Sequence, residues 1–523
     1  MKRRRRAKKK ANAQKAKLRA AAQLLLQYDL SGYTDRAERL ERRFILHVGE
    51  TNSGKTYQAL QALQSAPSGV YLGPLRLLAL EVFDTLNLAG CPCSLLTGEE
   101  SEQIPFSRHT ASTVEMCDFS QHYDVAVIDE AQMVADPYRG AAWTRAILGI
   151  DADEVHVCLA PEAQGILHSI LVRTHTSFRT VHHKRLARLV FSGAAKGLAS
   201  VEPGDALITF SRKEVLSTAA ALEQRGVSAS VIYGALPPAS RREEVRKFAQ
   251  GETTVVVATD AIGMGVSLPI RRIIFCQSMK FDGVSRRDLT VSEIKQIAGR
   301  AGRYGMYDVG EVLTMSDPEL IASALESRPP KITSLTLPFP AEALESEFDI
   351  PTLIRAWESL PVMRRTSRES LSEALFLYRA LAPVLTGPQD KQAVFRCVGC
   401  PVDVGNRELV GYWRDCAAAL LQGRTVPPVP FGTETLEDCE LRFKALDVRR
   451  QMLRRAGIEE SVSAEQAALS GQINRFLRAD KSGFLRRCAR CHSVLPFNHS
   501  HRLCEKCWQR YCEARSAERN GYK

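Results

Sequence analysis

A short segment near the beginning of the chain, residues 47–56 (HVGETNSGKT), has two glycines followed by a lysine and a threonine. It follows the apolar run RFILHVG and precedes KTYQALQAL, which has the apolar spacing of a helix. A glycine-containing loop that opens a helix binds phosphate through its backbone N–H groups and the helix dipole. In such a loop Lys55 reaches the β- and γ-phosphates and Thr56 binds Mg²⁺. The predicted nucleotide-binding residues of this loop are Gly49, Glu50, Thr51, Asn52, Ser53, Gly54, Lys55 and Thr56.

A second segment, VAVIDEAQ over residues 125–132, ends an apolar strand in two adjacent carboxylates. Asp129 is predicted to hold Mg²⁺ through its water shell, and Glu130 to orient and deprotonate an attacking water. The alternative interpretation is a pair of solvated acids at the end of a strand. The glycine loop upstream favours the catalytic interpretation, because together the two features supply both halves of a site that cleaves a nucleoside triphosphate.

These two features alone do not separate a motor protein from a nucleotide kinase, but QIAGRAGRYG (296–305) favours a motor. Arg300 and Arg303 lie three residues apart on the start of a predicted helix and would face the same way. Such a pair suits insertion onto the γ-phosphate of a nucleotide held between two domains. Gln296, one turn earlier, would contact the same phosphate or its water. The alternative is a basic surface helix.

The chain that positions these residues alternates strands and helices twice before it becomes mainly helical. Alternation of this kind predicts parallel sheets covered by helices on both faces. The predicted strands are RFILHVG, GVYLGP, YDVAVIDE and EVHVCLAP, and then DALITFS, SASVIYG, TTVVVATD and IRRIIFCQ. The predicted domains are a basic arm with short helices (1–42), two α/β domains (43–185 and 186–330), a helical domain (331–475) and a basic segment (476–523).

The charge of the chain, +12 over 523 residues, is concentrated at its two ends. Residues 1–20 contain eleven Lys/Arg and no acid, which indicates either a solubilising tail or an arm that neutralises nucleic-acid phosphates. A mitochondrial presequence is a third interpretation. No apolar run reaches the roughly 18 residues that span a bilayer, and no secretory signal is visible. A cytoplasmic location is predicted, with the mitochondrial matrix as the alternative.

Four of the fourteen cysteines form two Cys-x-x-Cys pairs near the C-terminus. Pairs at this spacing predict a structural Zn²⁺ site, closed to catalysis, made by Cys488, Cys491, Cys504 and Cys507. The alternatives are four free thiols or a Cys₃His site that uses His492, His499 or His501. Basic residues with Trp508 and Tyr511 beside the second pair indicate either a nucleic-acid grip or a protein-docking module. A further pair, Cys397 and Cys400, is predicted to be simply buried.

Several longer motifs occur in a fixed order: GETNSGKTYQAL, YLGPLRLLALEVFDTLN, LLTGEE, STVEM, VIDEAQMVADPYRGAAWTRAILG, VIYGALPP, ATDAIGMG, RRIIF and QIAGRAGRYG. In this order they resemble the mitochondrial degradosome RNA helicase family, which belongs to superfamily two and is related to the superkiller-type helicases. The resemblance covers residues 43–310 closely and extends more loosely through LPFP and CPVDVGNRELVGYW.

The resemblance implies two tandem RecA-like domains and an ATP-dependent helicase that loads on a 3′ single strand. Such enzymes move 3′-to-5′ and unwind RNA duplexes, often DNA and hybrids too, in RNA processing or decay. It also implies an exoribonuclease partner. The implied catalytic residues are Lys55, Glu130, Gln296, Arg300 and Arg303, and Gly263 in ATDAIGMG joins the nucleotide contacts. The implied strand contacts are Pro74, Arg76, Thr97, Gly98, Thr113, Ser211 and Thr259.

The chain also departs from the family pattern. Glu50 stands where a proline commonly follows the first glycine of the loop, and it places a negative charge near phosphates. The basic arm replaces a long N-terminal domain, and the C-terminal end differs, which weakens the implied exoribonuclease partnership.

Two rival functions remain at this stage. A thymidine-kinase-like nucleotide kinase would use the same loop but would hydrolyse ATP without regard to RNA. A non-catalytic RNA-binding scaffold would be expected to have lost Lys55, Glu130 or the arginines, all of which are present.

Overall fold

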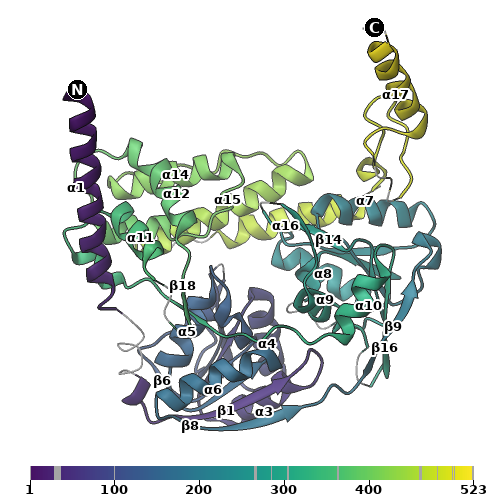
Figure 1. Ribbon diagram of the computed structural model, residues 1–523. Coiled ribbons are helices and arrows are strands. Elements are labelled where there is room, and N and C mark those ends of the chain that lie inside the picture. Colours follow the sequence, from purple (N-terminus) through teal and green to yellow (C-terminus); the bar gives the residue numbers. More distant parts are fainter. Residues whose placement is uncertain are drawn as a thin grey trace. The chain divides into compact units, whose positions relative to one another are not determined.

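The structure, a computed structural model, divides the chain into two compact units (Figure 1). Unit 1 comprises Met1–Arg185 and Pro330–Leu469, and unit 2 comprises Leu186–Pro329 and Ser470–Lys523. The residues described are 2–28, 37–98, 100–263, 268–283, 285–302, 305–361, 364–458, 462–479, 481–497, 499 and 501–520, with side chains from 12 to 513.

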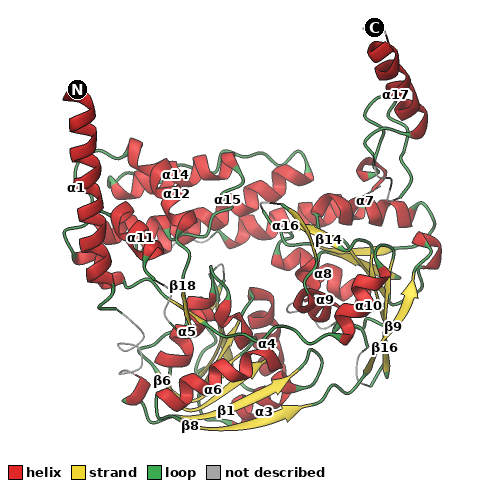
Figure 2. Cartoon of the chain, in the orientation of Figure 1, coloured by secondary structure: helices red, strands yellow, loops and turns green. Residues whose placement is uncertain are grey.

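Unit 1 contains an eight-stranded sheet among its described residues, in the order β4-β3-β5-β2-β6-β7-β1-β8. All neighbours are parallel except β3 and β4. The strands, yellow in Figure 2, are β1 (Arg43–Gly49), β2 (Gly69–Gly73), β3 (Cys93–Leu96), β4 (Ser101–Glu102), β5 (His109–Thr113), β6 (His122–Ile128), β7 (Asp151–Leu159) and β8 (Ser177–His183). The helices among them are α3 (Lys55–Ser65), α4 (Arg76–Leu88), α5 (Gly140–Gly149) and α6 (Gln164–Arg173).

Both faces of this sheet are buried, as the unbroken apolar runs of its central strands require. In β6, Val125 and Val127 pack in one cluster with residues of α3 and α4, whereas Ala126 and Ile128 pack in another with residues of α5 and α6. The alternation arises because successive side chains of a strand point to opposite faces. The sheet is therefore a rigid layer whose carboxyl edge can hold a site.

The rest of unit 1 is mainly helical, as predicted. Its helices are α11 (Ile350–Ser359), α12 (Ser372–Leu381), α13 (Lys391–Val398), α14 (Arg407–Leu421) and α15 (Leu436–Arg455), and β17 (Leu335–Leu337) pairs with β18 (Thr366–Arg368). Trp357 and Trp413 are fully buried, and Cys397 and Cys400 are buried as predicted. The helix α16 (Ser463–Arg478) begins among the residues of unit 1 and ends among those of unit 2.

The basic arm is a single helix, α1 (Lys2–Leu25), rather than a charged tail followed by a separate short helix. Alanine, lysine and arginine all favour helix, which explains why the charge block continues into the apolar segment without a break. Ala21 and Leu25 are buried at its C-terminal end, and Lys17 Nζ forms an ion pair with Asp349 at 2.5 Å, beside α11.

Unit 2 contains a six-stranded parallel sheet among its described residues, in the order β11-β12-β10-β13-β16-β9. The strands are β9 (Arg188–Ala194), β10 (Asp205–Ile208), β11 (Ala229–Ile232), β12 (Val255–Ala258), β13 (Arg272–Phe275) and β16 (Val309–Thr314), with a hairpin of β14 (Met279–Phe281) and β15 (Arg286–Asp288). The helices are α7 (Arg212–Glu223), α8 (Pro238–Ala249), α9 (Val291–Ala298), α10 (Pro318–Glu326) and α17 (Glu505–Asn520).

The structure confirms the predicted fold class: two parallel α/β sheets, a helical region after them, and a small cysteine-containing segment at the end. The five-part domain division stays a prediction, because the structure groups the residues into two units. Among the described helices, none is both long and apolar enough to cross a membrane.

Candidate nucleotide, strand and metal sites

The glycine loop joins the end of β1 to the start of α3, the context that a phosphate-binding loop requires. Gly54 caps α3 with φ of 80°, and Asn52 has φ of 60°, so the loop turns through left-handed backbone. Gly49 is required for another reason. A Cβ at this position would lie 2.9 Å from the carbonyl oxygen of His183, because β8 passes close beside it.

Two polar side chains of the loop are buried. Lys55 is 6% exposed, and its Nζ donates to the carbonyl oxygen of Glu50 at 3.4 Å, a long hydrogen bond. Ser53 Oγ is buried and has no hydrogen-bond partner among the described residues. Buried polar atoms are normally paired, so both groups fit a site whose missing partner is an anion such as a phosphate.

The two acids predicted as catalytic lie at the same edge of the sheet as the loop. β6 ends at Ile128, directly before Asp129, and β7 lies between β6 and β1. Since the three strands are parallel, their carboxyl ends meet at one edge. The sheet thus brings Thr56 Oγ1 to 3.3 and 3.4 Å from the two carboxylate oxygens of Asp129. A hydroxyl and a carboxylate are oxygen ligands of the kind that Mg²⁺ prefers.

Other side chains hold these acids, and the sequence analysis did not single them out. Tyr71 of β2 donates to Asp129 Oδ2 at 3.0 Å, and the indole N–H of Trp143 donates to its carbonyl oxygen at 2.9 Å. Gln132 Nε2 donates to Glu130 Oε2, while Gln132 Oε1 accepts from Ala160 N at 3.1 Å. Gln132 lies inside the acidic motif itself, whereas no pattern in the sequence marks Tyr71.

Burial, together with the charge of Glu130, raises the pKa of Asp129 to about 6, and nearby Lys55 opposes this shift. Below that pH the carboxyl group is protonated, so a proton would compete with any Mg²⁺ that Asp129 holds. We therefore expect ATP hydrolysis at limiting Mg²⁺ to fall about tenfold per pH unit below pH 6. Excess Mg²⁺ should move this acidic limb of the pH–rate profile to lower pH. Rate profiles at two Mg²⁺ concentrations test this, and a limb that does not move would contradict it.

Three of the residues predicted in the second α/β domain lie together. The guanidinium of Arg300 donates to the carbonyl oxygen of Gly263 at 3.0 and 2.6 Å. A Cβ at Gly263 would lie 3.5 Å from Gln296 Cγ. The predicted common helix for the arginines was wrong, because α9 ends at Ala298 and Arg300 lies in the turn that follows. Its direction is set by the contact with Gly263 rather than by helical spacing. Arg303 lies outside the described residues.

The residues of unit 1 that were predicted to contact a nucleic-acid strand are more buried than the sequence implied. Thr97 and Thr113 are buried, and Thr97 Oγ1 accepts from Glu100 N at 2.8 Å. Pro74 accepts a hydrogen bond from Arg139, at its carbonyl oxygen. Gly98 directly follows Thr97 and has no neighbour within 4 Å of a would-be Cβ among the described residues.

Helix α15 contacts two of the segments that were predicted to bind a nucleic-acid strand. The guanidinium of Arg76 lies 4.0 Å from the carboxylate of Asp447, and Arg454 donates to the carbonyl oxygen of Thr97 at 3.1 Å. Burial raises the pKa of Asp447 to about 6, against the opposing charges of Arg76 and Arg450. The helical region therefore contributes to this face of the first sheet.

The residues of unit 2 that were predicted to contact a nucleic-acid strand lie at the starts of helices. Ser211 is the N-cap of α7, where its hydroxyl oxygen accepts from Glu214 N at 3.2 Å. Thr259 follows β12 and is 7% exposed, and its Oγ1 accepts from Ala261 N at 3.3 Å. The two residues thus follow neighbouring parallel strands, β10 and β12, at the carboxyl edge of the second sheet.

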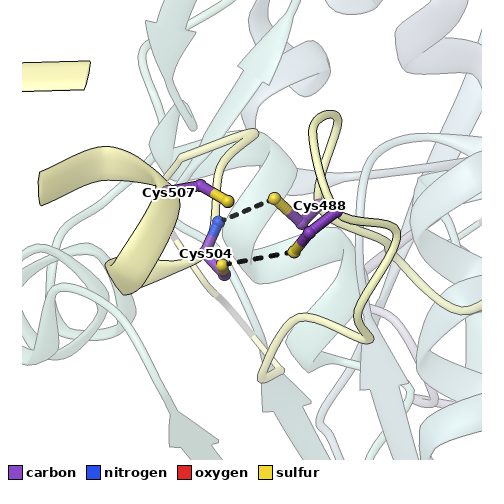
Figure 3. Close-up of side chains that lie close together, drawn as sticks. Cys488, Cys504 and Cys507 are labelled. Carbon is purple, nitrogen blue, oxygen red and sulfur yellow. Dashed lines mark hydrogen bonds between the residues drawn. The ribbon is translucent and has the colours of Figure 1, made fainter. Parts of the chain in front are cut away.

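The four C-terminal cysteines converge, with all four sulfur atoms within 4.8 Å of one another. Figure 3 shows three of them, Cys488, Cys504 and Cys507, directed toward a common centre. Cys491 Sγ lies 3.6 Å from Cys504 Sγ. Four thiolates bound to Zn²⁺ at 2.3 Å lie about 3.8 Å apart, so the cluster fits that ion. A hydrogen bond from Cys504 N, at 3.2 Å, is the main cause that lowers the pKa of Cys488 to about 6.

Comparison with protein-family models matches residues 31–183 to the DEXQ-box helicase domain of Suv3. Residues 186–305 match the helicase conserved C-terminal domain. In this chain the DEXQ box reads Asp129-Glu130-Ala131-Gln132, the segment that ends β6.

Curated relatives agree with these matches. The chain is 48% identical over 302 residues to the mitochondrial DExH-box ATP-dependent RNA helicase DExH16 of Arabidopsis thaliana, covering 56% of this chain and 53% of that protein. It is 44% identical over 297 residues to the mitochondrial ATP-dependent RNA helicase SUPV3L1 of Homo sapiens, covering 54% of this chain and 38% of that protein. The chain thus spans about half the length of the first of these relatives, and less of the second.

Among solved structures, S. cerevisiae Dbp5 bound to RNA and ADP BeF3 covers 55% of this chain and 85% of its own, at 13% identity and a TM-score of 0.42. Over residues 31–305 the chain is similar to the Suv3-type helicases, with a match to their DEXQ-box domain followed by a match to the helicase conserved C-terminal domain.

Proposed function

We propose that this protein is an ATP-dependent RNA helicase, which hydrolyses ATP to move 3′-to-5′ along a single strand and unwind RNA duplexes in RNA processing or decay. The observation that carries the proposal is the meeting of Thr56 with Asp129 beside buried Lys55, in a domain of the Suv3 type. The curated relatives are themselves named ATP-dependent RNA helicases, which supports the same activity.

In the proposed mechanism each residue of the candidate site has a distinct role. Lys55 and the backbone of residues 49–56 would bind the β- and γ-phosphates, and Thr56 and Asp129 would hold Mg²⁺, which would neutralise phosphate charge. Glu130 orients the attacking water and takes its proton. Gln132 fixes the carboxylate of Glu130 by its hydrogen bond. Gln296, Arg300 and Arg303 are proposed to act on the γ-phosphate.

Strand displacement tests this function. Duplexes of RNA and of DNA with a 3′ or a 5′ overhang are incubated with the protein, with and without ATP. We expect separation of RNA duplexes that carry a 3′ overhang, only with ATP, and ATP hydrolysis stimulated by RNA. Hydrolysis indifferent to RNA would instead favour the kinase, and RNA binding without any hydrolysis would favour the scaffold.

We also propose a mitochondrial location for the protein. Both curated relatives are named mitochondrial, which supports the mitochondrial matrix over the cytoplasm that the sequence analysis placed first. Action on DNA and an exoribonuclease partner stay predictions from the family resemblance.

We further propose that the cysteine cluster holds one structural Zn²⁺ through four thiolates, because its sulfur atoms already lie at nearly the required separations. The purified protein is expected to contain about one zinc per chain by elemental analysis. Cys504→Ser should remove it, whereas Cys512→Ser, an exposed cysteine outside the cluster, should not. Absence of zinc from the wild-type protein would end the proposal.

A further inference from the structure

The C-terminal segment is attached to the second motor domain by specific contacts within unit 2. Arg478 forms an ion pair with Glu243 of α8 at 2.6 Å, and Lys481 forms another with Glu223 of α7. Leu485 and Leu495 are buried, and both line a small pocket against α7. The cysteine-containing segment 481–513 is therefore part of the surface of this motor domain.

A cavity of about 460 Å³ lies where this segment meets the domain. The domain contributes Ser211, Lys213 and Arg286 to its wall, and the segment contributes Arg486 and His499. Among the described residues of the wall there is one carboxylate, that of Glu214, and it accepts a hydrogen bond from Gln277 at 2.8 Å. Three cations thus face one acid. Since Ser211 Oγ already accepts from a backbone N–H, its own O–H remains to donate. These are the donors that bind a phosphate backbone.

A row of aromatic rings leads away from this cavity. The rings of His499, in the cavity wall, and His501 have centroids 6.2 Å apart. His501 stacks on Trp508 at 4.6 Å with an interplanar angle of 4°, and Trp508 stacks on Tyr511 at 5.7 Å. Trp508 is 38% and Tyr511 43% exposed. A nucleic-acid base adds to such a row at either end, by the same face-to-face stacking.

The charge of the segment distinguishes between the partners that could use these rings. Residues 481–513 contain seven Lys/Arg and two acids. Three of the cations, Arg502, Lys506 and Arg510, are exposed and lie within two residues of His501, Trp508 or Tyr511 in the sequence. A protein-docking surface is typically depleted of lysine and centred on apolar side chains. A polyanion with stacked bases matches both the charge and the rings.

We propose that the cavity and the row His501–Trp508–Tyr511 form a single-strand RNA-binding surface, in which the cavity takes backbone phosphates and the rings take bases. The surface would lengthen the strand path of the second motor domain beyond Ser211. It rests on the proposed function, because RNA is the ligand class. The test below therefore distinguishes a failure of this inference from a failure of the proposed function.

The test measures two quantities for the full-length protein. One is the Kd for a fluorescent oligo-U strand, and the other is the RNA concentration that half-saturates ATP hydrolysis. Trp508→Ala combined with Tyr511→Ala should raise both about tenfold or more, because each base stacked on an aromatic ring contributes measurably to affinity. Trp508→Phe with Tyr511→Phe should restore most of the loss. Cys512→Ser, on the same helix, should behave like the wild type. Zinc content reports whether each variant has kept the segment folded.

The cavity is tested by salt dependence, which does not rely on the ring variants. Arg286→Gln with Arg486→Gln should reduce the slope of log affinity against log salt by about 1.4, since each phosphate contact to a single strand contributes about 0.7. Wild-type affinity and slope in zinc-loaded variants would overturn the inference and favour protein docking. A loss confined to oligo-dT would overturn the assignment to RNA. Absence of RNA stimulation in the wild type would instead overturn the proposed function.

Discussion

Replacing Lys55 by alanine is expected to lower RNA-stimulated ATP hydrolysis by at least about a hundredfold. The lysine is buried at the start of α3, directed back toward its own loop at Glu50. Its ammonium group would offset the charge that develops on the β- and γ-phosphates, and alanine cannot replace that charge. Initial rates over a range of RNA concentrations measure the effect.

The matched control for this variant is Lys331→Ala, which removes an exposed lysine from the same unit. It should hydrolyse ATP at the wild-type rate. Thermal unfolding of both variants separates lost chemistry from lost folding. Wild-type turnover by a folded Lys55→Ala protein would refute the assignment of the nucleotide site.

Glu130→Gln is expected to separate ATP binding from hydrolysis. The amide has nearly the shape of the carboxylate but cannot take a proton from water, so turnover should fall by about a hundredfold to ten-thousandfold. Affinity for a fluorescent ATP analogue should stay near that of the wild type, because Lys55, Thr56 and Asp129 are untouched. The variant should therefore hold RNA in the presence of ATP without separating strands.

The neighbouring Gln132→Ala variant serves as a comparison, because it removes the side chain that positions Glu130 but leaves the carboxylate. A smaller loss of turnover is expected from it. If Glu130→Gln hydrolysed ATP as fast as Gln132→Ala, Glu130 would not be the base.

The geometry of the candidate nucleotide site in unit 1 was largely predictable from sequence, because each of its parts is a short local segment. An apolar run followed by Gly49 and by a helix predicts the loop, and parallel strands bring their carboxyl ends to one edge. That rule predicts that Thr56 and Asp129 meet, and they do, at 3.3 Å. Six described strands of the two large sheets were missed, the interior strands β3, β5 and β16 as well as the edge strands β4, β8 and β9. The edge strand β8 is only half-buried and lacks a long apolar run.

The residues that sequence reasoning missed depend on contacts between distant segments. Tyr71 reads as one more apolar residue of a buried strand, yet its hydroxyl supports Asp129. The contact of Arg76 with Asp447 joins residues far apart in the chain, and neither lies in a pattern that names the other. Arg300 shows a different error. Its spacing from Arg303 suggested that both residues lie on one helix, but α9 ends two residues before Arg300.

The contacts of α15 limit how far the protein can be shortened. The closely matching motifs end near residue 310, so a fragment cut there would keep all of them. Such a fragment would lack the carboxylate beside Arg76 and the guanidinium that holds the loop at Thr97. Losing both contacts should destabilise this edge of the first sheet, where the side chain of Arg76 is partly exposed and that of Asp447 is largely buried. Dissection of this protein should therefore keep α15 with the first sheet.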